Sequence, residues 1–118
     1  MTAYFSFEQS DPKGNILEFI FALDDETRIA EARAIISDST FPKRHVMGTV
    51  IQSRAVYNPS WSFHLAPNSI SFFENAIEVC DANLTYVEAH LDEVGGAFLP
   101  KSHWCPWSSW LIREVALS

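Results

Sequence analysis

The sequence predicts an α+β domain in which a mostly antiparallel sheet of about five strands packs on one long helix and one shorter helix. Three observations predict this class: two apolar runs joined by turn residues near the N-terminus, an apolar stripe with helical spacing over residues 70–94, and a second stripe over 25–37. The chain has 118 residues, of which 47% are hydrophobic, which is enough for one core and too little for two. We therefore expect residues 1–118 to form a single domain.

Two strands open the chain. The aromatic residues Tyr4, Phe5 and Phe7 begin the first strand, and residues 16–23 form an apolar run typical of the second. Residues 10–15, Ser-Asp-Pro-Lys-Gly-Asn, are of the types that dominate turns. This pattern predicts a β-hairpin.

The shorter helix is expected at residues 25–37. The acidic run at residues 24–26 places negative charge where the dipole of a starting helix favours it. Ile29, Ala32 and Ile36 then recur at the spacing of one buried helix face.

Three further strands complete the predicted sheet. Residues 45–56 are apolar enough for a central strand, and Gly48 within them predicts a bulge or the close approach of another backbone. Residues 61–65 alternate between apolar and polar side chains, and residues 108–115 form a closing strand. The predicted order is β-β-α-β-β-α-β.

The long helix over residues 70–94 is predicted from seven apolar residues that are alternately four and three positions apart. These are Phe73, Ile77, Cys80, Leu84, Val87, Leu91 and Val94. Ser71 and Glu74 match the Ser-x-x-Glu capping box, and the two glycines at 95–96 supply a C-terminal stop. Asp-Ala-Asn at 81–83 is poor helix sequence, so a bend would fall there.

The formal net charge of −7 argues against nucleic-acid binding, because a basic surface is needed to neutralise phosphates. A basic partner is compatible with this charge. No segment is apolar enough to be a transmembrane segment, and the N-terminus lacks the basic region and apolar run of a signal peptide. The default expectation is a cytoplasmic protein, unless a leader has been removed from the chain.

A line of acidic residues runs beside the apolar stripe of the predicted long helix. It consists of Glu74, Glu78, Asp81, Glu88 and Asp92, with Thr85 between them. Residues 70–94 contain no Lys or Arg, so the carboxylates need cations from elsewhere. One interpretation is salt bridges within the chain, to Arg28, Arg33, Arg54 or Arg113. The other is a surface for a basic partner or a divalent cation, which Glu78 and Asp81 could bind together.

The two cysteines, Cys80 and Cys105, allow several chemistries. They are either buried thiols in a reducing compartment or a disulfide in an oxidising one. Together with His64 and His103 they offer nitrogen and sulfur ligands of the kind that zinc prefers, although not at zinc-knuckle spacing. Cys105 beside an imidazole could also act as a nucleophile, but Pro106 removes a backbone N–H that often completes an oxyanion hole.

Two aromatic loops, residues 57–61 and 103–110, hold all four tryptophans. Tyr and Trp dominate binding hot spots, although the same residues could close one end of the core. The leading hypothesis is therefore a non-catalytic binding module, inhibitor-like in kind, that recognises a protein or small ligand through these loops. The candidate contact residues are Tyr57, Trp61, His64, His103, Trp104 and Trp107.

The alternative is a metal-binding or thiol-dependent enzyme. It would use His64, Glu78, His103 and Cys105, and the metal candidates are Glu78, Asp81, Cys80 and Cys105. No dinucleotide fingerprint, P-loop or HExxH pattern occurs, so the sequence predicts no cofactor and leaves only a divalent cation open.

Four segments resemble the N-terminal domain family of the social-amoeba protein called binding protein seventy-four, which includes small bacterial proteins. They are Trp-Ser-Phe-His-Leu at 61–65, the segment 76–82, the segment 87–96 and Trp-Cys-Pro-Trp-Ser-Ser at 104–109. The resemblance extends from about Tyr4 to Val115. It implies a stand-alone domain and brings no reaction, cofactor or catalytic residue with it.

Overall fold

The chain begins with the predicted hairpin. β1 (Ala3–Ser10) and β2 (Ile16–Leu23) pair antiparallel over their whole length. The turn between them is closed by the carboxylate of Asp11, which accepts hydrogen bonds from the backbone N–H groups of Lys13 and Asn15.

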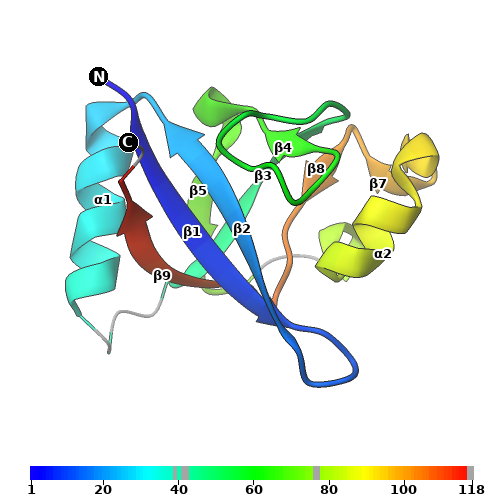
Figure 1. Cartoon of the computed structure of the whole chain (residues 1–118), viewed down its shortest axis with the longest axis horizontal. Helices are drawn as coiled ribbons and strands as arrows, with labels where there is room; N and C mark the ends of the chain where they lie inside the picture. The colour runs from blue at the N-terminus through cyan, green and yellow to red at the C-terminus, as the bar shows by residue number, and fades with distance from the viewer. Residues whose placement is uncertain (39, 41–42, 76–77, 117–118) are drawn as a thin grey trace.

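β9 (Trp110–Val115) pairs antiparallel with the other edge of β1, so the first sheet has the order β2-β1-β9. This sheet faces the viewer in Figure 1, with β9 in red beside β1 in dark blue.

The computed structural model describes residues 1–38, 40, 43–75 and 78–116, and for Glu78 the backbone alone.

α1 (Glu26–Ser37) confirms the shorter helix, with Asp25 as its N-cap residue. The Asp25 carboxylate accepts a hydrogen bond from the Thr27 N–H at 2.8 Å. The buried face consists of Ile29, Ala32 and Ile35. The helix lies along the side of the first sheet (Figure 1), where Arg33 forms a bidentate ion pair with Glu114 of β9.

The second sheet is organised around β3 (His45–Ile51). The start of β3 pairs with β5 (Ser71–Phe73), its middle with β8 (His103–Trp104) and its end with β4 (His64–Leu65), all antiparallel. A 3-10 turn, η1 (Pro67–Ser69), separates β4 from β5 along the chain.

Two strands of this sheet are shorter than predicted. The strand expected over 45–56 ends at Ile51, and only the last two residues of the expected strand 61–65 pair in the sheet. Gly48 is closely packed, since a Cβ there would lie 3.2 Å from the side chain of Ile70, but the neighbouring atoms belong to side chains and not to the second backbone that the sequence predicted.

The core fills the space between the two sheets and α1. Its largest fully buried aromatic side chains are Phe5, Phe7, Phe19, Phe21, Phe63 and Trp104. The indole of Trp104 meets the rings of Phe7 and Phe63 edge-on, at centroid distances of 5.8 and 5.5 Å.

The long helix predicted over residues 70–94 is wrong. After β5, the chain forms a 3-10 turn η2 (Glu78–Cys80), a short helix α2 (Leu84–Ala89), a second 3-10 turn η3 (Leu91–Glu93) and β6 (Val94–Gly95). Within the described ranges α1, with 12 residues, is the longest helix.

Tertiary pairing overrides the helical pattern in this segment. Ser71 pairs with Met47 in the second sheet, so it does not cap a helix. Asn83, in the stretch identified as poor helix sequence, instead caps α2 by accepting a hydrogen bond from the Tyr86 N–H at 2.8 Å. The apolar spacing is therefore met by several short elements, each packed on a different neighbour.

β6 pairs with β7 (Phe98–Pro100), and this two-stranded pair is parallel whereas the other strand pairs are antiparallel. The predicted class, α+β with mostly antiparallel strands, is confirmed, but the predicted element order is replaced by a larger number of shorter strands. None of the helices described has the length and hydropathy needed to cross a membrane.

Candidate functional site

Four rings form a row that runs from the loop before β9, across β5 and β3 of the second sheet, to the first residue of β9. They are Trp107, Phe73, His45 and Trp110, and we call them the aromatic row. The ring centroids are 6.5 Å apart for Trp107 and Phe73, 5.3 Å for Phe73 and His45, and 5.8 Å for His45 and Trp110. Trp110 is 48% exposed, Trp107 and His45 are half-buried, and Phe73 is buried. The indoles at the two ends of the row are therefore at least partly open to solvent, and the ring of Phe73 between them is buried.

Ser109 joins the row to the start of β3. Its hydroxyl accepts a hydrogen bond from the Val46 N–H at 2.9 Å and donates to the Pro106 carbonyl at 2.6 Å. Its carbonyl oxygen lies 2.6 Å from Nδ1 of His45. Because a carbonyl only accepts, Nδ1 carries the hydrogen and the ring orientation is fixed.

Arg44 supports Trp110 from the protein side. Its side chain is buried, and its guanidinium donates to the carbonyls of Ile35 at 2.9 Å, Asp38 at 2.8 Å and Leu111 at 3.3 Å. Its Cζ lies 5.2 Å from the centroid of the Trp110 ring, a cation–π contact. Arg44 thereby ties the end of α1 to β9 and limits the movement of the exposed indole.

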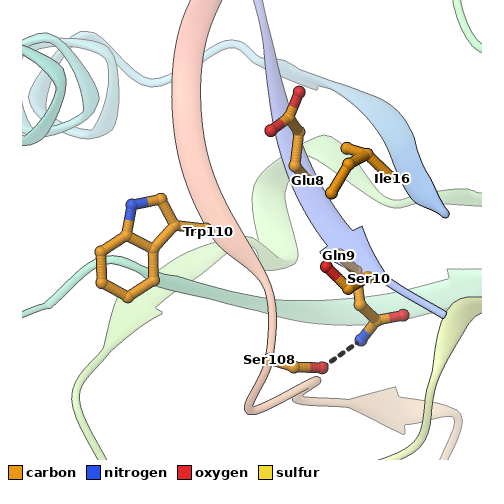
Figure 2. Close-up of a pocket in the computed structure, with 6 residues that line it drawn as sticks. All are labelled: Glu8, Gln9, Ser10, Ile16, Ser108 and Trp110. Carbon is orange, nitrogen blue, oxygen red and sulfur yellow. Dashed lines mark hydrogen bonds between the residues drawn. The ribbon is translucent and has the colours of Figure 1, made fainter. Parts of the chain in front are cut away.

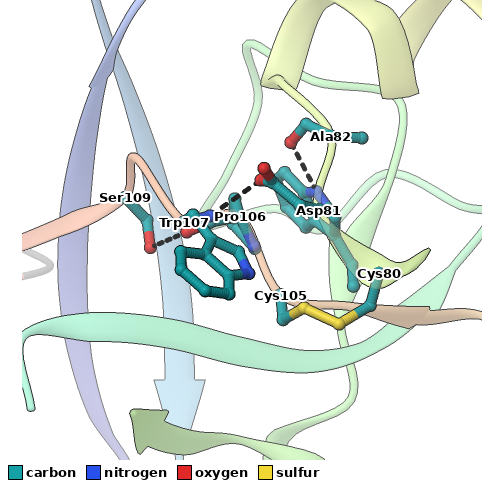
Figure 3. Close-up of a disulfide and its surroundings, with 8 residues drawn as sticks. Cys80, Asp81, Ala82, Cys105, Pro106, Trp107 and Ser109 are labelled. Carbon is teal, nitrogen blue, oxygen red and sulfur yellow. Dashed lines mark hydrogen bonds between the residues drawn. A yellow bond between two sulfur atoms is a disulfide. The ribbon is translucent and has the colours of Figure 1, made fainter. Parts of the chain in front are cut away.

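A disulfide supports the other end of the row (Figure 3). Cys80 and Cys105 are bonded, with their Cα atoms 5.1 Å apart. They pack with Phe73, Met47 and Trp107 in a small cluster separate from the main core. The Cys105 N–H donates to the Cys80 carbonyl at 2.7 Å, and the Trp107 N–H donates to the Asp81 carboxylate at 2.9 Å. The loop that carries Trp107 is thus held at several points.

Two buried side-chain atoms of the described residues lack a hydrogen-bond partner, and both belong to this region. They are Nε of Arg44 and Nε1 of Trp107. A buried unsatisfied donor costs about 1–3 kcal/mol, so such groups are rare and call for an explanation. Their position at the two ends of the aromatic row sets this surface apart from the rest of the described structure.

Trp110 also lines a shallow pocket of about 160 Å³ on the outside of the first sheet (Figure 2). The lining residues are Glu8, Gln9, Ser10, Ile16, Ser108 and Trp110. In the strand register Glu8 lies between Glu18 on β2 and Trp110 on β9. Glu18 is paired with Arg113 at 2.9 Å, whereas the Glu8 carboxylate has no hydrogen-bond or ion-pair partner among the residues that the structure describes.

A larger pocket of about 440 Å³ lies between α1 and η1. It contains no aromatic ring, and the Arg28 guanidinium in it is already engaged by the Ile70 carbonyl and the Glu31 carboxylate. This pocket therefore offers fewer free groups for recognition than the surface around Trp110.

The residues predicted to bind a ligand do not share one surface. Trp104 is completely buried, and its Nε1–H donates to the Ala82 carbonyl at 2.9 Å, so it belongs to the core. Trp107 lies in the aromatic row. His103 is half-buried on β8, opposite Thr49 of β3.

Tyr57, Trp61 and His64 lie in another part of the molecule. The ring of Tyr57 contacts those of Tyr4 and His64, at centroid distances of 5.2 and 6.3 Å. The Trp61 Nε1–H donates to the Glu18 carbonyl at 2.9 Å, so its loop covers the edge of β2. Among the described rings, no contact connects this group with the aromatic row.

Burial raises the pKa of the Tyr57 hydroxyl above its ordinary value of 10.0, and the nearby Tyr4 and Asp24 raise it further. A raised pKa favours the neutral phenol. The Tyr57 hydroxyl is therefore a hydrogen-bonding group here, rather than a source of negative charge.

In this oxidised form the disulfide contradicts two predictions from the sequence, the zinc site and the nucleophilic Cys105. A zinc site or a nucleophilic Cys105 requires a free thiolate, and both sulfurs are committed to each other. Across the described ranges no group of three or more His, Cys, Asp or Glu side chains is placed to hold a metal ion. The Glu78 side chain, also a metal candidate, lies outside the described part of the chain.

The predicted acidic face is not formed, because the helix that would carry it is absent. Asp81 accepts its hydrogen bond from Trp107, and Glu88 accepts one from the Ser62 N–H at 2.8 Å. The ion pairs among the described side chains are Arg28–Glu31, Arg33–Glu114 and Arg113–Glu18. None of these ion pairs involves a member of the acidic line.

Four residues of this surface were not predicted from the sequence, namely Glu8, Arg44, His45 and Phe73, and Trp110 was predicted only as part of the aromatic loop 103–110 and not as a named contact residue. Glu8 alternates with buried Phe7 and Gln9, which is a signal for an outward side chain. The contact of His45 with Phe73 has no such signal, because it depends on the pairing of β3 with β5.

These features define a class of protein: a small α+β domain, linked by one disulfide among its described residues, that presents aromatic side chains on its outer surface. The family model for the N-terminal domain of binding protein seventy-four matches residues 1–118, and the chain belongs to this family. The match confirms the resemblance seen in the sequence. No curated protein and no solved structure matches the chain.

Proposed function

We propose that this domain is a non-catalytic binding module that holds a protein or small ligand against the aromatic row and the adjoining pocket. The observation that carries the proposal is Trp110, an indole 48% exposed and supported from beneath by buried Arg44. An aromatic side chain that is already ordered loses little entropy on binding, which is why Trp is enriched in hot spots.

The anchoring of the row supports the same function. The disulfide, Ser109 and Arg44 each fix one part of it to the fold. A binding surface built on such supports is preorganised, so little of the interaction energy is lost in ordering it.

The enzyme alternative has less support. It needs His64, Glu78, His103 and Cys105 to act together, yet Cys105 is in the disulfide and His64 contacts Tyr57 in another part of the molecule. The binding module needs no residue beyond those already placed around Trp110.

We infer further that the domain works in an oxidising compartment. The support is the Cys80–Cys105 bond, because structural disulfides persist in such compartments and are rare in the cytosol. This inference replaces the cytoplasmic default, which rested on the absence of sorting signals alone.

A fragment screen on protein labelled with fluorotryptophan tests the binding function. Each of the four tryptophans gives its own fluorine NMR signal, and single Trp→Phe variants assign the signals. Fragments that bind are expected to shift the signals of Trp107 and Trp110 and to leave that of buried Trp104 nearly unchanged. Binders that shift only Trp61, or none of the four, would contradict the proposal.

A further inference from the structure

We propose that the aromatic row holds a Trp or Tyr side chain of an extended protein segment, and that this side chain donates a hydrogen bond to Nε2 of His45. The inference rests on the proposed binding function and names the chemistry that the row recognises. Figure 2 shows the Trp110 indole extending from β9 away from Glu8 and Gln9, so the ligand is placed on the row and not in the pocket.

His45 supplies a hydrogen-bond acceptor in the middle of the row. Its Nδ1 donates to the Ser109 carbonyl at 2.6 Å, so in the neutral imidazole the other nitrogen, Nε2, carries a lone pair. Nε2 has no partner in the part of the chain that the structure describes, and the buried unsatisfied atoms found there are Arg44 Nε and Trp107 Nε1. Nε2 of the half-buried His45 is therefore open to solvent, and a ligand with a polar hydrogen can bind to it.

The surroundings of this acceptor are aromatic. The centroid of the imidazole lies 5.3 Å from that of Phe73, with the planes tilted by 49°, and 5.8 Å from that of Trp110, with the planes tilted by 69°. A group that reaches Nε2 packs against these rings, which favours another aromatic ring over an aliphatic alcohol or amide. The indole of Trp and the phenol of Tyr combine such a ring with a polar hydrogen.

Charge argues for a neutral ligand. The Arg44 guanidinium already lies 5.2 Å from the centroid of the Trp110 ring, so a cation placed on the same ring would be repelled by it. An ionised carboxylate accepts hydrogen bonds and has no hydrogen to give to Nε2. A neutral N–H or O–H group avoids both mismatches.

The length of the row favours a protein segment over a single small molecule. Its successive ring centroids are 6.5, 5.3 and 5.8 Å apart, so one bound ring covers only part of it. In an extended segment, side chains on the same face are about 7 Å apart, which is close to these spacings. A segment with an aromatic residue at every second position therefore places one ring on His45 and others toward Trp107 and Trp110.

The test titrates the full chain with the capped pentapeptide Phe-Ala-Trp-Ala-Phe and with the same peptide methylated on its indole nitrogen, which keeps the ring and removes the N–H. The titrations are made at about pH 8, where an ordinary imidazole is neutral. The unmethylated peptide is expected to shift the fluorine signal of Trp110 in fluorotryptophan-labelled protein and the nitrogen NMR signal of His45 Nε2. The methylated peptide should bind about fivefold or more weakly, as expected for one lost hydrogen bond.

A pair of matched variants locates the acceptor. His45→Phe keeps a ring in the row and removes Nε2, so it should bind the unmethylated peptide about fivefold more weakly and no longer distinguish the two peptides. His90→Phe is the control, because His90 is also half-buried and its Nδ1 also lies close to a backbone carbonyl, that of Tyr86 at 2.8 Å. This variant should bind both peptides as the wild type does. If His45→Phe fails to fold, the comparison of the two peptides on the wild type still decides the question.

The other outcomes overturn the inference in distinguishable ways. If both peptides bind the wild type equally, or if fragments shift Trp110 and neither peptide does, the hydrogen bond to His45 is wrong and the binding function stands. If free indole binds as tightly as the unmethylated peptide, the row takes a small molecule and the protein segment is wrong. If no peptide or fragment shifts Trp107 or Trp110, the proposed function fails together with the inference.

Discussion

The guanidinium of Arg44 lies over the indole of Trp110, with its Cζ 5.2 Å from the ring centroid, so a buried cation supports the most exposed ring of the aromatic row. The same guanidinium donates to carbonyl groups of α1, of the segment that follows it and of β9. The orientation of the exposed indole therefore depends on the packing of the fold. Replacing Arg44 should lower mainly the stability of the fold, and replacing Trp110 should lower mainly its binding.

Replacing Arg44 with Met should lower the free energy of unfolding by about 3 kcal/mol or more, because buried carbonyls lose their donors. Arg54→Met is the matched control, since Arg54 is exposed and has no side-chain partner in the described structure. Urea unfolding of the two variants measures the difference. Equal stability of both variants would show that Arg44 does not join the elements as described.

The division between core and surface tryptophans predicts opposite effects of truncation. Trp104→Ala should cost about 3–5 kcal/mol, because a fully buried indole leaves a cavity. Trp110→Ala should cost about 1 kcal/mol, the scale of one cation–π contact at a partly exposed ring. Thermal or urea unfolding measures the loss of stability in each variant. A larger loss for Trp110→Ala than for Trp104→Ala would place the Trp110 side chain in the core instead.

Replacing both Cys80 and Cys105 with Ala should lower the free energy of unfolding by about 3.5 kcal/mol, which the chain-entropy estimate gives for a loop of this length. The wild-type protein should lose a similar amount when a reductant is added, whereas the double variant should not respond. Two free thiols in the unreduced, denatured protein would contradict the disulfide and with it the oxidising compartment.

Stability should fall in alkaline solution through Tyr57. Because burial raises the pKa of its hydroxyl in the folded state, the folded protein holds this proton more tightly than the unfolded chain. The contribution is complete below the unfolded pKa of about 10 and is lost as the pH rises through the raised pKa. Tyr57→Phe should therefore lose less stability than wild type above this pH. Parallel decline of both proteins would contradict the assignment.

Elements with local signals were predictable from the sequence. The turn chemistry around Asp11 predicted the first hairpin, and Asp25 with the buried stripe from Ile29 predicted α1 within one residue. In both places the residue type that marks the end of an element in the sequence also makes the hydrogen bond that fixes this end in the structure. The sequence alone therefore predicts where these elements end.

The segment after η1 was not predictable in this way. Phe73, Cys80 and Leu84 have helical spacing, but they serve a strand, a disulfide and a short helix. Spacing alone cannot reveal that the partner of Ser71 is Met47 on β3, or that Cys105 lies beside Cys80. Contacts between residues far apart in sequence decided the structure here.

The candidate site shows the same limit. The sequence predicts binding through two aromatic loops, and one of their residues, Trp107, lies in the row that the structure forms. Trp104, three residues earlier, is a core residue because the β8 register turns it toward the interior opposite Gly48. Which tryptophans reach the surface depends on strand register, which the sequence does not determine.

The most direct test of the binding function compares Trp110→Ala with Tyr86→Ala in their affinity for ligands found by the fragment screen. Both residues are exposed, at 48% and 47%, so the two variants remove similar aromatic surface. Calorimetric titration should show a loss of about tenfold or more for Trp110→Ala, the scale of a hot-spot residue, and no change for Tyr86→Ala. Unchanged affinity of Trp110→Ala, or a greater loss in Tyr86→Ala, would contradict the assignment of this face as the binding surface.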